Sequence, residues 1–219
     1  MSRIIDLTLD LYQGMPVFPA PWYPNPEMSF VLTPDQDAAG RTASKVVLFN
    51  HAGTHMDAPL HFVRGGQPID RVPLETLFGT ALVVDMYQKG NLEPITAQDL
   101  DTAVALRSGS GFRLLIRTGY TTRNWGRRDY FSASPYLTQD AAEWIVRQGF
   151  CLVAIDFQTD RPGDASFPVH KTLLGNGVII VEYLTNVEAI TRDRVLLVAL
   201  PLRLRGLEAS PCRVIAVEE

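Results

Sequence analysis

The chain has 219 residues, enough to bury a sizeable core in one large domain rather than two. Apolar residues make up 46% of it and charged residues 20%, which excludes a disordered chain. The net charge is −4, with both signs mixed along the sequence. Neither a basic stripe for nucleic acid nor a run of 18 or more apolar residues for a membrane span is present.

Runs of β-branched and aliphatic residues recur along the chain and predict nine strands. Several of these runs are apolar throughout, which is typical of central strands covered on both faces. The predicted strands span residues 3–11, 28–32, 44–50, 81–87, 112–120, 150–157, 177–184, 194–202 and 212–219.

Two helices are predicted between these strands. One begins at Thr96, where a capping hydroxyl precedes Asp99 in the first turn. The other begins at Thr138 and ends at Gly149, which suits a left-handed C-terminal cap. Strands with a few interposed helices predict a mixed α/β fold, with a single domain over residues 1–219 and a β-rich core.

Residues 14–26, GMPVFPAPWYPNP, contain five prolines and three aromatic residues. Proline has no backbone N–H to donate to a ladder, so we expect an extended proline-rich arm and not a central strand. One interpretation is a surface arm packed on the domain. The other is an aromatic wall over a pocket or a dimer contact, because exposed aromatic residues usually need a partner.

The two cysteines, Cys151 and Cys212, lie in runs that predict buried strands. Isolated thiols in core strands fit a reducing compartment better than a disulfide scaffold. The first residues carry two aspartates among apolar residues and lack the apolar region and cleavage site of a signal peptide. We therefore expect a cytoplasmic protein.

The segment HAGTHMDAPLHF, residues 51–62, is rich in potential metal ligands. It holds three of the chain's four histidines and one aspartate: His51, His55, Asp57 and His61. Its glycine, threonine and proline argue against a helix, so we expect the strand over 44–50 to run on into it. In a fully extended chain residues 51 and 55 would lie about 13 Å apart, too far to share one ion. The chain must bend between them, and Gly53 permits the bend.

Two imidazoles and a carboxylate from one short segment are a typical ligand set for Zn²⁺ or a similar divalent ion. Three protein ligands leave a position open for water, which is the catalytic rather than the structural arrangement. Surface histidines or satisfied core histidines are the alternative. The clustering of these residues in a histidine-poor chain disfavours it.

His170 and Glu182 are the natural distant partners of this segment. His170 lies in a predicted loop with proline and glycine on both sides, and Glu182 interrupts an otherwise apolar run. A carboxylate at the end of a buried strand is costly unless it is paired or binds a metal. Asp156 and Asp85 have similar settings, and spacing alone does not rank the three carboxylates.

HAGTHMDAPLHF resembles the pattern H-x-G-T-H-x-D-x-P-x-H-F of the cyclase family, which contains bacterial kynurenine formamidases and isatin hydrolases. Residues 117–146 resemble the family's middle segment, and residues 170–186 resemble its C-terminal motif. The resemblance implies a metal-dependent hydrolase with a mixed β/α swivelling fold, a single domain of β/β/α type that forms a homodimer or homotetramer.

Carried over residue by residue, the resemblance implies one or two divalent ions per subunit, Zn²⁺ or alternatively Mn²⁺. Asp57 would bridge the two ions and Glu182 would contact both. His61 would be the general acid/base and not a ligand, and Asp156 would have a supporting role. The implied metal ligands are His51, His55, Asp57, His170 and Glu182.

The kynurenine formamidases of this family place a substrate-stacking aromatic residue, usually tryptophan, in the N-terminal segment, where this chain reads PVFPAPWYP. Phe18 stands at the equivalent position, and Trp22 follows in a longer loop. With Trp125, they are the candidates to stack on a planar substrate, and plain packing is the alternative for each. FQTDRPGD departs from the family's T-x-S-x-D, and NWGRRDYF is closer to the isatin-hydrolase branch.

The combined prediction is an enzyme that cleaves an amide, lactam or ester bond of a small, aromatic molecule, acting on C–N bonds other than peptide bonds. Water activated by the metal would attack the carbonyl, while His61 moves the proton from water to the leaving nitrogen. A ring-closing cyclase or dehydratase could use the same groups. A non-catalytic metal-binding protein would have no need of His61.

Overall fold

The computed structural model describes residues 2–105 and 113–218. The strands are β1 (Arg3–Asp6), β2 (Glu27–Leu32), β3 (Ala43–Val47), β4 (His55–Asp57), β5 (Phe78–Asp85), β6 (Pro94–Ile95), β7 (Arg113–Arg117), β8 (Tyr136–Leu137), β9 (Leu152–Ile155), β10 (Ile179–Glu182), β11 (Arg194–Pro201) and β12 (Ala209–Glu218). The α-helices are α1 (Leu74–Leu77), α2 (Ala97–Ala105), α3 (Tyr120–Asn124), α4 (Gln139–Arg147) and α5 (Pro168–Gly175). Among the described residues, no helix is long and apolar enough to cross a membrane.

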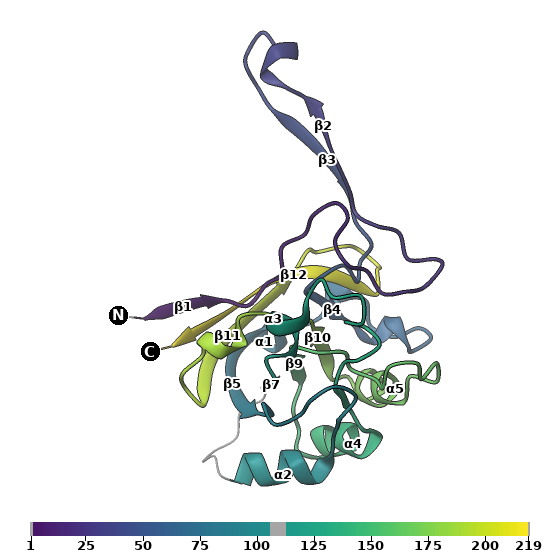
Figure 1. Ribbon diagram of the computed structural model, residues 1–219, viewed down its shortest axis with the longest axis vertical. Coiled ribbons are helices and arrows are strands. Elements are labelled where there is room, and N and C mark those ends of the chain that lie inside the picture. Colours follow the sequence, from purple (N-terminus) through teal and green to yellow (C-terminus); the bar gives the residue numbers. More distant parts are fainter. Residues whose placement is uncertain (1, 106–112, 219) are drawn as a thin grey trace.

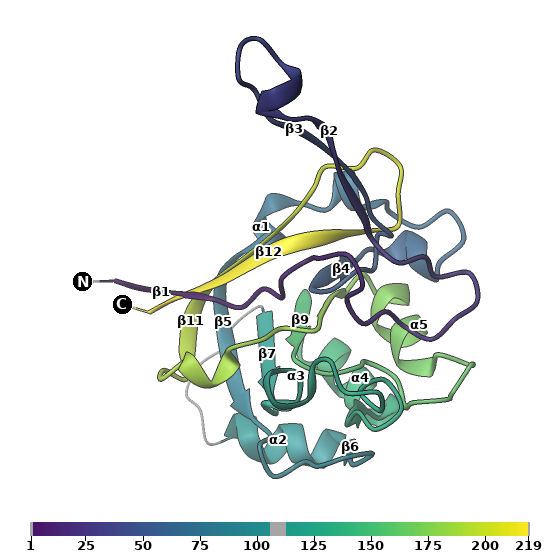
Figure 2. The same ribbon diagram turned by 45° about the horizontal axis from the view of Figure 1, so that its top comes forward.

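Eight strands form one sheet in the order β1–β12–β11–β5–β7–β9–β10–β4. Because β4 also pairs with β12, seven of these strands close into a barrel, and β1 pairs with β12 beside it (Figure 2). Neighbours among β5, β7, β9 and β10 are parallel, whereas β11 and β4 run antiparallel to theirs. The mixed α/β fold with a β-rich core is therefore confirmed.

The central residues of the parallel strands are apolar because the two faces of these strands cover different cores. Side chains alternate along a strand, so neighbours in β7 point to opposite sides. Leu115 joins the barrel interior with residues from β11 and β12 such as Leu197 and Val214. Leu114 and Ile116 instead pack in the core that lies beneath helices α2, α4 and α5 (Figure 1).

The strands β2 and β3 form a separate hairpin that projects from the barrel (Figure 1). Most of its side chains face solvent, and Phe30 and Val31 are 70% and 65% exposed. The apolar pattern predicts both strands correctly. It does not predict that they leave the barrel, because strand periodicity says nothing about which sheet a strand joins.

Both predicted helices are confirmed as α2 and α4, and Gly149 ends the second with a φ of +78°. The ends at 112 and 219 of two predicted strands lie outside the described residues. Two local predictions are wrong. The strand over 44–50 does not run on, because β3 ends at Val47 and the chain turns before β4. His170 lies in α5 and not in a loop, because Pro168 opens a helix there.

Candidate metal centre

The register between β4 and β10 places three candidate ligands on one face of the barrel wall. Glu182 pairs with His55 and Ile180 pairs with Asp57, while Met56 points into the barrel interior. Because side chains alternate along a strand, His55, Asp57 and Glu182 share the opposite face. Their proximity is thus a consequence of strand pairing between segments more than a hundred residues apart.

His51 reaches the same point because the chain turns sharply before β4. Gly53 has a φ of +58°, and a Cβ atom there would lie 2.7 Å from the Leu11 side chain. Glycine therefore supplies both the left-handed backbone and the space that the turn needs. The rings of His51 and His55 lie 5.1 Å apart, and the predicted bend at Gly53 is confirmed.

His170 reaches the cluster from the first turn of α5. Asp160 accepts the backbone N–H groups of Val169 at 2.8 Å and His170 at 3.2 Å, and it also contacts Nδ1 of the His170 ring. A carboxylate at a helix N-terminus is favourable, so Asp160 fixes both the helix and the ring. The ring's Nε2 atom then lies 3.4 Å from Asp57 Oδ2.

Asp57 lies at the centre of the cluster and is 1% exposed. Its Oδ1 atom is 2.9 Å from His51 Nδ1 and 3.5 Å from His55 Nε2. These approaches lack hydrogen-bond geometry, so among the described residues both Asp57 oxygens are buried without a donor. Buried carboxylate oxygens are costly in that state, and a cation that they bind removes the cost. The residues present therefore fit a divalent metal.

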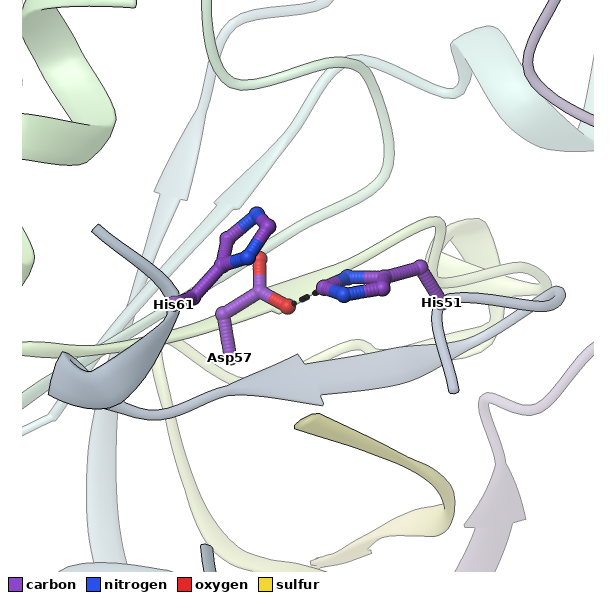
Figure 3. A group of neighbouring side chains, drawn as sticks. All are labelled: His51, Asp57 and His61. Atoms are coloured by element: carbon purple, nitrogen blue, oxygen red, sulfur yellow. Dashed lines mark ion pairs between the residues drawn. The ribbon is translucent and has the colours of Figure 1, made fainter. Parts of the chain in front are cut away.

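Two groups of described residues could each hold an ion, and they share Asp57. One consists of His55, Asp57 and Glu182, and the other of His51, Asp57 and His61. Figure 3 shows the second group, with the rings of His51 and His61 on either side of the Asp57 carboxylate. Proximity alone would therefore admit His61 as a ligand, and another observation must separate its role from that of the other histidines.

The hydrogen bonds on the far side of each ring distinguish His61 from the other three histidines. Three histidines each have one ring nitrogen anchored, which fixes the tautomer and turns the other nitrogen toward the cluster. The anchoring groups are the Gly53 carbonyl for His55, the Asp160 carboxylate for His170 and the Glu208 carboxylate for His51. The ring of His61 has no such hydrogen bond in the part of the chain that the structure describes. Its ring centroid lies 4.3 Å from that of His51.

Burial and neighbouring charges together set the protonation of the cluster. Burial by itself would raise the pKa of Asp57, but the imidazoles of His51 and His55 hold that pKa well below its usual range. Burial lowers the pKa of His55 to about 4 and the pKa of His61 to about 4. Near pH 7 both rings are therefore neutral, the form in which an imidazole binds a metal or accepts a proton.

Of the three carboxylates that spacing could not rank, only Glu182 belongs to a group that could hold an ion among the described residues. Its Oε2 atom lies 3.6 Å from His55 Nε2. Asp156 instead accepts the backbone N–H and the hydroxyl of Thr118, and burial raises its pKa to about 6. Asp85 pairs with Arg117 at the end of β5.

The cluster lies in the wall of a cavity of about 180 Å³. Phe18, Trp22 and Trp125 line the same cavity, so the proline-rich arm covers the cluster from its own chain. Phe18 packs edge-on against Phe131 at 5.8 Å between ring centroids, and Trp22 is 66% exposed. The other aromatic residues in the wall are Tyr23, Phe49, Phe62, Phe131, Phe167 and Tyr183.

Some of the residues around the cluster were not predicted as site residues, and the sequence indicates some of them better than others. Tyr23 lies in the predicted arm and Phe62 closes the histidine segment, so proximity to a motif could have found both. Asp160 lies in FQTDRPGD, which departs from the family pattern. Glu208 has no signal of this kind, because only the pairing of β12 with β4 brings it to the cluster.

Residues 5–161 match the family model described as "Putative cyclase", which covers more than half of the chain. A kynurenine formamidase from Bordetella petrii is 30% identical and covers 100% of this chain and 99% of its own. Cyclase-like protein 3 from Oryza sativa subsp. japonica is 31% identical over 99% of this chain and 80% of its own. The chain belongs to the Cyclase family, as its histidine segment predicts.

Solved structures agree with this assignment. A "predicted metal-dependent hydrolase from Bacillus stearothermophilus" is 29% identical, with a TM-score of 0.81 over 100% of both chains. An isatin hydrolase bound to the product analogue thioisatinate has a TM-score of 0.89 at 22% identity, over 99% of this chain and 92% of its own, and so shares the fold. With its His, Asp and Glu cluster, the chain is a metal-dependent hydrolase.

Proposed function

We propose that this enzyme hydrolyses an amide, lactam or ester bond of a small aromatic molecule, in first place a C–N bond outside peptides. One observation carries the proposal: a cluster able to hold a metal lies in the wall of a cavity whose remaining wall is largely aromatic. Aromatic walls favour planar apolar substrates. The names of the relatives, kynurenine formamidase and isatin hydrolase, support the same substrate class.

The metal would be held by the buried donors that converge on Asp57. Imidazole nitrogens with carboxylate oxygens suit Zn²⁺, with Mn²⁺ as the alternative, and the imidazoles beside both oxygens of Asp57, His51 at Oδ1 and His170 at Oδ2, give room for one or two ions. Such an ion supplies a Lewis acid that polarises a carbonyl and acidifies water. The proposed ligands are His51, His55, Asp57, His170 and Glu182.

His61 is the proposed general acid/base. Burial lowers its pKa to about 4, so the ring is neutral at pH 7 and can accept a proton from the attacking water. No hydrogen bond within the described residues fixes its ring, in contrast to His51, His55 and His170. After accepting the proton, His61 delivers it to the leaving nitrogen.

The rings of Phe18, Trp22 and Trp125 are proposed to stack on the substrate. All three line the cavity that contains the cluster. Trp22 also lies 5.7 Å from Phe49 and Phe18 lies 5.8 Å from Phe131, so each arm residue is already part of an aromatic surface. A planar ring that enters the cavity would meet these faces.

Ring closure is the second candidate activity. A structure that is 28% identical, with a TM-score of 0.81, carries the description "Potential Metal-Dependent Hydrolase With Cyclase Activity". The same metal and the same proton shuttle would serve a cyclase or a dehydratase, so the residues do not separate the two reactions. The product does, because hydrolysis adds one water to the substrate and ring closure by dehydration removes one.

A screen with product analysis tests the proposal. Protein loaded with Zn²⁺ or Mn²⁺ is incubated with N-formylkynurenine, isatin and a simple lactone, and the products are identified by mass spectrometry. We expect a gain of 18 Da on an aromatic amide or lactam, or its cleavage fragments, with His61→Ala as the inactive control. Turnover of the lactone alone would overturn the preference for C–N bonds and for an aromatic substrate, and a loss of 18 Da would replace hydrolysis with ring closure.

The assembly and the location are also proposals. We expect a homodimer or homotetramer, because the β2–β3 hairpin exposes Phe30 and Val31 where a second copy would cover them. Light scattering should give a particle mass that is a multiple of 24.3 kDa, and Phe30→Ser should lower that mass. A cytoplasmic location is supported by the two cysteines, Cys151 beside β9 and Cys212 in β12, because isolated cysteines in core strands are typical of reducing compartments.

A further inference from the structure

His51 is the one proposed ligand that lies in neither a strand nor a helix. Its ring is nevertheless held from both sides. Nδ1 lies 2.9 Å from Asp57 Oδ1, and Nε2 lies 3.2 Å from Glu208 Oε1. One nitrogen therefore faces the cluster, as Figure 3 shows, and the other faces a carboxylate that has no part in the chemistry above.

Glu208 comes from the far end of the chain, immediately before β12. Its carbonyl oxygen accepts the N–H of Ala58 at 2.9 Å, and its neighbour Ala209 pairs with Asp57. The ladder that closes the barrel thus holds Glu208 beside the turn that carries His51. The side-chain amide of Asn50 also donates to Glu208 Oε1, at 3.3 Å.

The other anchored histidines show what such a contact does. The Gly53 carbonyl holds Nδ1 of His55, and the Asp160 carboxylate holds Nδ1 of His170, so that in each ring Nε2 faces the cluster. A group that accepts the N–H on the far side of a metal-binding imidazole fixes its tautomer and increases its basicity. For His51 the roles of the two nitrogens are reversed, and Glu208 is the group on the far side.

We propose that Glu208 is a positioning residue, which accepts the Nε2–H of His51 and so keeps Nδ1 as the nitrogen that faces the metal. This inference rests on the proposed function, since it needs a metal at the cluster. The side chain of Glu208 is 30% exposed, so it can be replaced without opening a core cavity. Its effect should therefore appear on His51 and not on the fold.

Zinc affinity is the first test. Competition with a chromophoric chelator compares wild type, Glu208→Ala and Glu208→Gln. We expect Glu208→Ala to bind Zn²⁺ about 10–100-fold more weakly. Glu208→Gln should lose less Zn²⁺ affinity, because its amide oxygen can still accept the Nε2–H of His51. Asn50→Ala, which leaves the contact between Glu208 and His51 in place, and the exposed Glu75→Ala are the controls and should bind as wild type does.

Histidine NMR is the second test, and it has a readout that general destabilisation would not reproduce. With ¹⁵N-labelled histidine the zinc-loaded protein gives signals from only four rings. We expect a protected Nε2–H signal from His51 in wild type and Glu208→Gln, and its loss by exchange with water in Glu208→Ala. The signals of His55 and His170 should not change.

The outcomes separate this inference from the proposed function. A wild-type chain that binds no Zn²⁺ overturns both. Wild-type affinity and an unchanged His51 signal in Glu208→Ala overturn the positioning role alone, as does an equal loss of affinity in Asn50→Ala. If Glu208→Ala does not fold, Glu208→Asp repeats the test, because its shorter side chain no longer reaches the ring.

Discussion

The metal cluster and its aromatic cover are built in different ways. Asp57 and Glu182 of the cluster lie on paired strands, and both residues are at most 4% exposed. The aromatic cover is the part of the cavity wall that the proline-rich arm supplies, and it includes Phe18 and Trp22. The arm has no regular structure, and Trp22 is 66% exposed. Strand register therefore places Asp57 and Glu182, whereas the proposed recognition of substrate would depend on arm side chains that can change without moving these two residues. Five substitutions test this separation.

Asp57→Ala should have the largest effect. Asp57 is shared by both groups that could hold an ion, so its loss removes a donor from each of them. We expect metal content near zero and turnover at background. Elemental analysis of the purified protein measures this, with Asp35→Ala on the exposed hairpin turn as the control. Wild-type metal content in Asp57→Ala would show that the centre lies elsewhere.

His61→Ala should separate proton transfer from metal binding within the cluster. We expect the metal to stay, because no group among the described residues holds the ring of His61 in place as a ligand, and we expect turnover to fall about 10²–10⁴-fold. Metal content and the rate are measured on the same sample. Loss of the metal would make His61 a ligand, and an unchanged rate would remove it from the mechanism.

Trp22→Ala and Phe18→Ala should affect the cover alone. Each removes one ring from the cavity wall, so we expect aromatic substrate binding to weaken by about 1–3 kcal/mol, the range known for stacking on planar bases. KM or a competitive inhibitor's Kd reports this, while the metal content stays at the wild-type level. Phe78→Ala, which removes an exposed ring that does not line the cavity, is the matched control. Unchanged binding in both arm variants would reduce the arm to a structural role.

Tyr23→Phe should have the smallest effect, because it removes a single hydrogen bond between the cover and the cluster. The Tyr23 hydroxyl donates to the backbone carbonyl of His51, and its ring packs on Phe49 at 4.2 Å. Loss of the hydrogen bond should cost about 1 kcal/mol of unfolding free energy, as measured in urea. Metal content should not change. A loss of metal here would mean that the cover and the cluster are one unit.

Local chemistry accounts for what the sequence predicts well. Gly53 between two histidines indicates the bend, and the continuous apolar runs indicate strands with two covered faces. Pro168 and Gly175 are misleading, because proline and glycine mark helix ends as readily as loops. Glu208 and the projecting hairpin could not be predicted, since both depend on which strands pair, a long-range choice that no local pattern encodes.

Metal removal and return test the central claim most directly. The protein is stripped with a chelator, and the hydrolysis of N-formylkynurenine and isatin is followed while Zn²⁺ or Mn²⁺ is added in known ratios. We predict no turnover in the stripped protein and full recovery at one or two ions per chain, with no recovery in Asp57→Ala. Hydrolysis that survives complete removal of the metal, or that returns equally in Asp57→Ala, would contradict the account.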